Sequence, residues 1–230
     1  MFLDSRITTK WWDYANPPTI TQINQLTDVA YKTPSKQCVN EWRLVVIGPS
    51  TEGQAFKQSL YENHTWCDSQ GILGGSAAGP RVYNGQYLAP YLFIWLTRWR
   101  EIDLTKDPLE TRRADPLIRQ RLVNLEIGIC AGSVMTAAEH MGLDTGFGGC
   151  HNYLTLANLL GYPGESAWLA MGVGRGLDQS SWVKSTGEFK KPITVNGQTL
   201  GTDYANIPLA TKRHPIRQRK PAKAVLVKMR

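Results

Sequence analysis

The sequence has few cysteines and no arrangement of them that would cross-link a fold or hold zinc. Its four cysteines, Cys38, Cys67, Cys130 and Cys150, lie far apart and include no CxxC pair. This spacing argues against both a disulfide scaffold and a structural zinc site. Free thiols of this kind are typical of a reducing compartment, so we expect a cytoplasmic protein.

Long hydrophobic runs are also lacking. No segment approaches the roughly 20 consecutive apolar residues of a membrane helix. The longest candidate, residues 88–97, is interrupted by Pro90 and followed by Arg98 and Arg100. The first residues, MFLDSRITTKWWDY, contain no apolar core, so no signal peptide is expected. With 42% hydrophobic and 20% charged residues in 230, the composition predicts a globular protein with a sizeable core.

Acidic residues are absent from the last 20 residues, which hold eight lysines and arginines. Subtracting these eight from the formal net charge of +7 leaves −1 for residues 1–210. The basic character therefore belongs to a tail and not to the body. A solvated or partner-wrapping end is the favoured interpretation. A nucleic-acid-binding tail, residues 211–230, is kept as an alternative function, although nucleic-acid enzymes more often carry their charge on the folded surface.

Familiar catalytic motifs are missing too. The sequence has no P-loop and no GxSxG, and GVGRG at 172–176 does not have the GxGxxG spacing of a dinucleotide site. Cys150 and His151 are adjacent in the chain and cannot readily form a nucleophile–base pair. No metal-ligand spacing joins the histidines, which we expect to be structural or on the surface: His64, His140, His151 and His214. A catalyst built this way depends on a bound cofactor.

One long helix organises what is present. From Leu117 to Met141 there is no proline and apolar residues recur at helical spacing, and Gly142 is placed to end the helix. Within it lies a run of small residues, which includes Gly128 and Gly132. Interior glycines cost about 1 kcal/mol each relative to alanine. Close approach of another backbone or of a flat ligand would explain them. We expect the following residues, 142–150, to form a glycine-rich loop.

Helices and strands alternate without strict βαβ order in the rest of the chain. Helical patterns cover 19–32, 51–61 and 154–160, and buried strands are expected at 43–48, 88–97 and 166–174. The sequence AVLV at 224–227 is a candidate terminal strand. The pattern predicts an α+β sandwich in a single domain, residues 1–210, followed by a basic C-terminal extension, residues 211–230.

The N-terminal segment suits a phosphorylated ligand. Arg6, Thr8 and Lys10 alternate with Ile7 and Thr9. In an extended chain, alternate side chains share one face. A guanidinium, a hydroxyl and an ammonium would then face one ligand, and this set suits a phosphate and a polar heterocycle. Taken alone, the segment favours a solvated basic edge.

Four segments in order along the chain resemble the FMN-dependent nitroreductase family. They are SRITTKWWD at 5–13, TPSKQCVNEWRLVVI at 33–47, AAEHMGLDTGFGG at 137–149 and LANLLGYPGESAWLAMGVG at 156–174. The resemblance implies a three-layer α+β sandwich, with a central and mostly antiparallel sheet flanked by helices. It also implies an intertwined homodimer with two FMN sites at the subunit interface. The activity implied is reduction of FMN by NADH or NADPH and onward transfer of electrons to nitroaromatics, quinones or related acceptors.

The resemblance also implies roles for individual residues, carried over by position. Arg6 and Thr8 would bind the FMN phosphate and ribityl chain, and Lys10 the N1/O2 edge of the flavin. Gly148 and Gly149 would offer backbone N–H groups towards N5 and O4. The remaining implied cofactor contacts are a loop from the other subunit, an amide at the pyrimidine ring and a late basic pair at the phosphate: Pro34, Ser35, Lys36 and Cys38; Asn84; Lys190 and Lys191. No protein side chain is expected to be catalytic, because the cofactor transfers the hydride, and no metal is expected.

The chain departs from the family pattern in the loop before the first strand. Cys38 stands where the family usually has Asn, Asn40 where it has Gln, and Glu41 where it has Pro. A non-redox or flavin-consuming FMN binder on the same fold therefore remains a second hypothesis.

Overall fold

The computed structural model describes residues 9, 12–35, 40–65, 84–99, 102, 104–105, 114–149 and 151–176, with the backbone of 193–195 and 198–200. The chain divides into two compact units, Met1–Val183 and Lys184–Arg230. In the second unit, β5 (Ile193–Val195) pairs antiparallel with β6 (Gln198–Leu200). The predicted strand at 224–227 lies outside the described residues. The predicted domain division at residue 210 stays a prediction.

The first unit is built on a four-stranded antiparallel sheet. The strand order is β1–β2–β4–β3, so β1 and β3 are the edge strands. Their bounds are Trp42–Ile47 for β1, Tyr91–Thr97 for β2, Asp144–Gly148 for β3 and Ala167–Gly174 for β4. Every residue of β2 is buried, as expected of a central strand covered on both faces.

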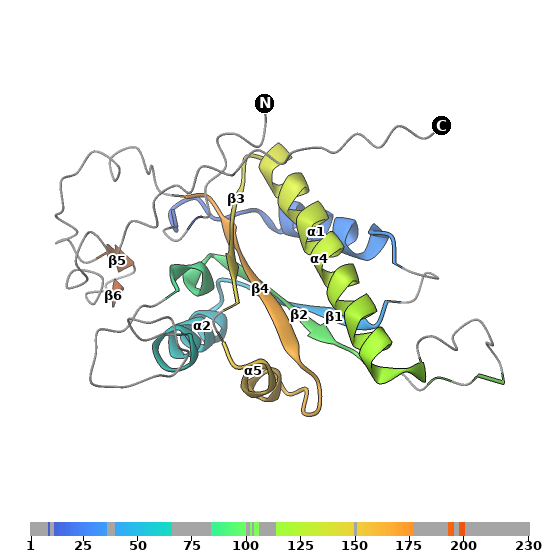
Figure 1. Cartoon of the computed structure of the whole chain (residues 1–230). Coiled ribbons are helices and arrows are strands. Elements are labelled where there is room, and N and C mark those ends of the chain that lie inside the picture. Colours follow the sequence, from blue (N-terminus) through green and yellow to red (C-terminus); the bar gives the residue numbers. More distant parts are fainter. Residues whose placement is uncertain are drawn as a thin grey trace, which may run out of the picture. The chain divides into compact units, whose positions relative to one another are not determined.

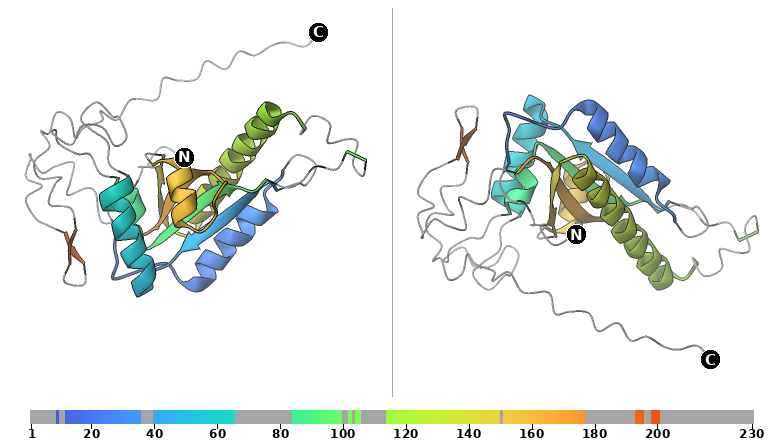
Figure 2. Two further views of the ribbon diagram at one scale, coloured as in Figure 1. Left: turned by 90° about the horizontal axis from the view of Figure 1, so that it is seen from below. Right: turned by 90° about the horizontal axis from the view of Figure 1, so that it is seen from above.

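Helices cover both faces of this sheet, in three layers. The helices are α1 (Ile20–Lys32), α2 (Thr51–His64), α4 (Pro116–His140) and α5 (Tyr153–Leu159), with a short 3₁₀ helix, η2 (Gly85–Leu88). Figures 1 and 2 show α1 and α4 together on one face, and α2 and α5 on the other. The predicted α+β sandwich with an antiparallel sheet is confirmed.

Local sequence explains where the helices begin and end. Thr19 and Gln22 form a reciprocal capping box at the start of α1, an arrangement that typically stabilises a helix by about 1 kcal/mol. Asp115 caps α4 by accepting from the backbone N–H groups of the second and third residues that follow it, at 2.8 and 3.2 Å. Gly142 follows α4 with φ of +68°, the left-handed conformation predicted for the residue that ends the helix.

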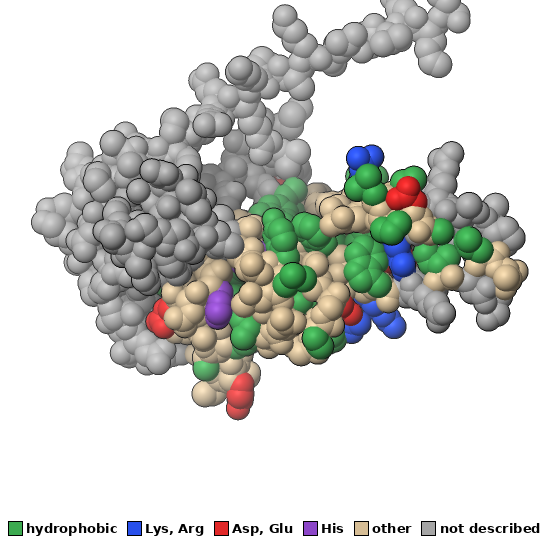
Figure 3. Space-filling view, turned by 60° about the horizontal axis from the view of Figure 1, so that its bottom comes forward, with side chains coloured by type: hydrophobic (Ala, Val, Ile, Leu, Met, Phe, Trp, Pro, Cys, Tyr) green, Lys and Arg blue, Asp and Glu red, His purple; other side chains and the backbone are tan. Residues whose placement is uncertain are grey.

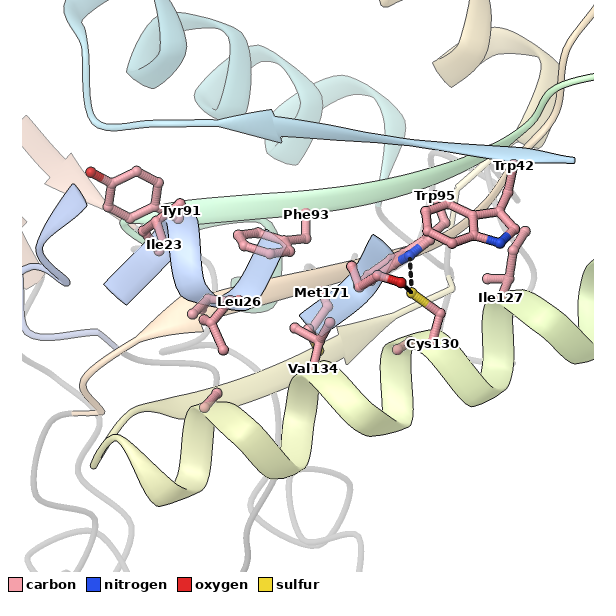
Figure 4. Close-up of a cluster of buried hydrophobic side chains, with 14 of the residues drawn as sticks. Ile23, Leu26, Trp42, Tyr91, Phe93, Trp95, Ile127, Cys130, Val134 and Met171 are labelled. Carbon is pink, nitrogen blue, oxygen red and sulfur yellow. Dashed lines mark hydrogen bonds between the residues drawn. The ribbon is translucent and has the colours of Figure 1, made fainter. Parts of the chain in front are cut away.

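Two apolar clusters hold the layers together. Trp42, Phe93 and Trp95 lie between the sheet and the α1–α4 layer, where the Trp95 indole nitrogen lies 3.3 Å from the Cys130 sulfur (Figure 4). The opposite face is filled by alternate residues of the same strands, including Leu92 and Ile94, together with side chains of η2, α2 and α5. By length and composition alone, α4 could cross a membrane. However, it lies beside α1 in this sandwich and contributes buried residues to the core.

The prediction of a glycine-rich loop after the long helix, at residues 142–150, is wrong for most of this segment. Residues 144–148 form the edge strand β3, which pairs with β4 from Asp144↔Gly174 to Gly148↔Ala170. Glycine is depleted in strands because it loses much backbone entropy on folding and has no side chain to pack. Pairing with β4 and close contacts from other segments outweigh that preference here.

Lys57 of α2 is buried at 2% exposure, and its Nζ donates to the Ala89 and Pro90 carbonyls, at 2.7 Å each. Burial lowers the pKa of Lys57 to about 8. Since the pKa is lower in the folded chain than in the unfolded chain, the unfolded state binds more protons between the two values. The contribution of Lys57 to stability should therefore rise as the pH increases from about 8 towards 10.5.

We predict that Lys57→Met leaves both carbonyls without their donor and lowers the free energy of unfolding by about 1–3 kcal/mol. Urea denaturation should show the wild-type advantage over Lys57→Met growing between pH 8 and pH 10.5. A neutral amine still has two N–H donors for the two carbonyls, so the hydrogen bonds survive deprotonation. An advantage that shrinks with rising pH would contradict this account.

Candidate functional site

Four glycines lie on one face of the two strands at the β3 edge of the sheet. Gly146 and Gly148 alternate along β3, and Gly172 and Gly174 alternate along β4. Because side chains in a strand alternate between faces, these four positions point to the same side. Pairing aligns Gly146 directly with Gly172. The result is a patch of bare backbone on the face that also carries η2.

The segment Asn84–Pro90, which includes η2, packs onto this glycine patch. A Cβ on Gly172 would lie 2.3 Å from the Gln86 carbonyl oxygen, and one on Gly146 would lie 2.8 Å from Gln86 Cγ. Both distances are shorter than real Cβ contacts. Gly146 and Gly172 are therefore required because another segment of the chain approaches them closely. The sequence led us to expect such close approach at the glycines of the long helix.

Side chains from distant parts of the chain fix the same segment. Trp12 Nε1 donates to the Gly85 carbonyl at 3.0 Å, and the Tyr14 hydroxyl donates to the Leu88 carbonyl. The Asn84 amide donates to the Thr65 carbonyl at the end of α2, at 2.7 Å. With Lys57 at the other end, nearly every residue of the segment has a partner outside it.

The N-terminal segment reaches the edge of the sheet beside β3. The Thr9 N–H donates to the Thr145 carbonyl at 3.1 Å, and a Cβ on Gly146 would meet the Thr9 carbonyl oxygen at 2.1 Å. Trp12 forms a bridge with Gly176 beyond the end of β4. Thr9 is 1% exposed. The outer edge of β3 has no further described strand beside it in this sheet, and residues from the start of the chain partly cover it.

Comparison with known proteins places this arrangement in a family. The family model described as the nitroreductase family matches residues 3–175. The chain belongs to the nitroreductase family. That match spans both the N-terminal segment and the end of β4, so it includes every element of the glycine patch.

Solved structures of this family share the fold at low sequence identity. An Exiguobacterium sibiricum protein named as a nitroreductase, solved in complex with FMN, is 17% identical with a TM-score of 0.56; 77% of this chain and 87% of that chain are covered. A nitroreductase family protein from Clostridium novyi is 13% identical with a TM-score of 0.55; the match covers 82% of this chain and 89% of that chain. A Staphylococcus epidermidis protein named as an NAD(P)H:FMN oxidoreductase is 19% identical with a TM-score of 0.54; the match covers 77% of this chain and 86% of that chain. No curated protein matches the chain.

The structure separates the two glycines that the family resemblance treats as a pair. A Cβ on Gly148 would lie 2.6 Å from Cε2 of the Tyr87 ring, so this glycine is required by packing within the chain. Gly149 is exposed, and among the described residues nothing lies within 4 Å of its would-be Cβ. No contact within the described part of the chain explains Gly149. A group from outside the described chain can therefore approach its backbone, which is what a flavin edge would need.

Of the other predicted cofactor residues, the structure describes three, Asn84, Pro34 and Ser35, which lie on different elements. Asn84 is joined to the Gly148 region through Tyr87, but its amide nitrogen is engaged by Thr65. Pro34 and Ser35 follow α1, which packs on the opposite face of the sheet from the glycine patch. The remaining predicted contacts lie outside the described residues: Arg6, Thr8, Lys10, Lys36, Cys38, Lys190 and Lys191.

One departure from the family pattern has a structural explanation. Glu41 is fully buried and pairs with Arg119 of α4, whose Nε donates to the carboxylate at 2.8 Å. Arg119 also lies over the Trp99 ring, with its guanidinium carbon 5.0 Å from the ring centroid. The carboxylate at position 41 therefore ties the loop before β1 to the start of the long helix. A proline there could not make this contact.

Sequence reasoning missed Gln86, Tyr87 and Lys57, which carry most of the packing at this site. His151 was expected to be structural or on the surface, and it is 2% exposed with both ring nitrogens engaged. The available signal was the alternation of glycines in GFG and GVG at 146–148 and 172–174. Such alternation inside strand patterns indicates close approach of another backbone.

The two glycines give a matched pair of substitutions. We predict that Gly148→Ala lowers the free energy of unfolding by about 1–3 kcal/mol, because the new methyl group must displace the Tyr87 ring. Gly149→Ala should stay within about 0.5 kcal/mol of wild type, because its site is open and exposed. Chemical denaturation of the cofactor-free protein measures both. Equal losses from the two variants would show that the difference in packing has no energetic consequence.

Proposed function

We propose that this chain is an FMN-dependent NAD(P)H oxidoreductase that works as a homodimer on nitroaromatic, quinone or related acceptors. The observation that carries the proposal is the open backbone of Gly149 at one end of β3, with the N-terminal segment anchored at the other end through Thr9. A strand rises about 3.3 Å per residue, so Thr145 and Gly149 are about 13 Å apart. This distance separates the two points at which one flat ligand is proposed to be held.

FMN, when bound, would supply hydride acceptance and donation, a chemistry that protein side chains lack. The chain would supply position and charge. Lys10, which directly follows the anchored Thr9, is proposed to neutralise the N1/O2 edge, and Arg6, Lys190 and Lys191 to hold the phosphate. Charge-assisted contacts of this kind are stronger than neutral hydrogen bonds. The Gly149 N–H is proposed to face the opposite edge of the ring system.

No protein acid or base is assigned a role in this chemistry. Hydride transfer between stacked rings depends on distance and orientation, so fixed positioning provides the rate enhancement. The many bonds that fix the Asn84–Pro90 segment and β3 supply that rigidity. The FMN-bound neighbour and the family match support a flavin oxidoreductase. The electron donor and the acceptor class remain part of the proposal.

A second subunit would complete the site. Pro34, Ser35, Lys36 and Cys38 are the proposed contacts from the loop after α1. The structure describes Pro34 and Ser35, which follow α1 on the other side of the sheet from Gly149. These two residues would not reach a ligand at Gly149 of the same chain, whereas in a dimer the partner's copies could. This geometry favours a cofactor shared between subunits, and fits the intertwined dimer that the family resemblance implies.

The long helix offers a surface for that second copy. Leu125 and Ile129 are 60% and 46% exposed on its outer face, although both are apolar. Gly128 and Gly132 lie between and beside them, and a Cβ on either would meet none of the described residues within 4 Å. Small residues four apart allow two helices to approach closely. We propose that this face of α4 packs against the partner subunit.

Cofactor content tests the first part of the proposal. We expect the purified protein to be yellow, with an FMN absorption band near about 450 nm that NADH or NADPH bleaches under anaerobic conditions. A yellow protein that no nicotinamide bleaches would support the non-redox FMN binder instead. A colourless protein that takes up no added FMN would refute both.

A lysine pair tests the proposed role of Lys10. We predict that Lys10→Met weakens FMN binding about 10–100-fold, the range expected for loss of one hydrogen bond to a charged group. Lys32→Met is the matched control, because the Lys32 side chain is 79% exposed and its ion pair with Asp28 lies on the surface. Fluorescence titration of the cofactor-free protein measures both affinities. Equal affinities would remove Lys10 from the site.

The dimer surface has its own test. We predict that Leu125→Glu shifts the protein from dimer to monomer in analytical ultracentrifugation, because it places a charge in an apolar contact. Leu159→Glu serves as the control, since Leu159 is 47% exposed on α5. If Leu125→Glu remains dimeric at the same concentration, the outer face of α4 is not the contact surface.

A further inference from the structure

Two buried polar side chains meet directly beneath the candidate site. Tyr87 of η2 is fully buried and His151 is 2% exposed. The Tyr87 hydroxyl is hydrogen-bonded to His151 Nδ1, and His151 Nε2 lies 2.6 Å from the Ala167 carbonyl oxygen in β4. The imidazole therefore links η2 to the sheet through both of its nitrogens.

The partners of His151 determine where its hydrogen lies. A backbone carbonyl can only accept, so Nε2 must carry the hydrogen and donate to Ala167. In a neutral imidazole Nδ1 is then the acceptor, and the Tyr87 hydroxyl donates to it. Burial lowers the pKa of His151, which favours this neutral form. The arrangement is a directed chain from Tyr87 through His151 to Ala167.

The hydrogen-bonded residues Tyr87 and His151 lie next to the chain on either side of the exposed Gly149. Gly148 packs on the Tyr87 ring, with a would-be Cβ 2.9 Å from Cζ, and pairs with Ala170 of β4. His151 follows only three residues later. Successive Cα atoms are about 3.8 Å apart, so a backbone held at Gly148 and at His151 leaves little freedom to Gly149.

We propose that Tyr87 and His151 are positioning residues that set the place and direction of the Gly149 amide at the flavin edge. The inference rests on the proposed function, because only a ligand at Gly149 gives that amide a task. Neither side chain touches the cofactor in this account. They act through the backbone that they hold on either side of Gly149, and their effect should appear in cofactor binding and cofactor electronics.

Tyr87→Phe is the informative substitution. It keeps the ring that supports Gly148 and removes only the hydroxyl that orients His151. We expect FMN to bind about tenfold more weakly, the size of effect that a single hydrogen bond produces. The absorption spectrum and midpoint potential of bound FMN should also shift, because an amide that faces the ring edge changes the ring's electronic environment. General loss of packing would not move the spectrum of the cofactor that remains bound.

Tyr153→Phe is a matched control. The Tyr153 ring also lies against His151, edge-on with centroids 5.7 Å apart, but it belongs to α5 and is 41% exposed. Loss of the Tyr153 hydroxyl should leave the FMN affinity, the FMN absorption spectrum and the midpoint potential at wild-type values. Wild-type affinity and spectrum in Tyr87→Phe would overturn the proposal. A wild-type protein that binds no FMN would instead refute the proposed function.

A measurement on the wild-type protein decides the matter if Tyr87→Phe does not fold. Nitrogen NMR of the cofactor-free chain should show His151 with hydrogen on Nε2. Titration with FMN should then move the His151 ring resonances together with the Gly149 amide. Ring resonances that stay fixed while the Gly149 amide shifts would show that His151 is not coupled to the site, and would overturn the proposal.

Discussion

Bare backbone on one face of β3 and β4 is the constraint on which the rest of this structure depends. Gly146, Gly148, Gly172 and Gly174 leave room for the segment Asn84–Pro90 to lie directly on the sheet. A methyl group at Gly172 would meet that segment within 2.3 Å. Protein interiors are packed as densely as organic crystals, so such a clash could not be absorbed locally. Packing within the chain thus requires these glycines.

This packing gathers parts of the chain that are far apart in sequence. Trp12 and Tyr14 from the N-terminal segment, and Lys57 from α2, all bond to backbone carbonyls between Gly85 and Pro90. The same segment supports Gly148 through Tyr87. The start of the chain and the end of β3 are therefore positioned by one rigid element. The proposed cofactor site between them would inherit that rigidity without a dedicated catalytic side chain.

Helices and central strands were predictable from local pattern, and the edge strand was not. Thr19 and Gly142 mark helix ends by their own chemistry, and the structure uses them as expected. Three of the five residues of β3, one aspartate and two glycines, are of types that are depleted in strands. They become a strand because β4 pairs with them. Glu41 is similar, since a buried carboxylate there has meaning only once Arg119 of α4 lies beside it.

The sequence by itself determined the class of fold, the helix boundaries and the family, because these follow from periodicity, caps and ordered short motifs. It could not distinguish Gly148 from Gly149, which look alike in GFGG. Only tertiary structure decided that Tyr87 occupies the space over Gly148, while no described residue occupies the space over Gly149. The physical reason is that a glycine's role is set by what approaches it, and the approaching atoms belong to residues more than 60 positions away.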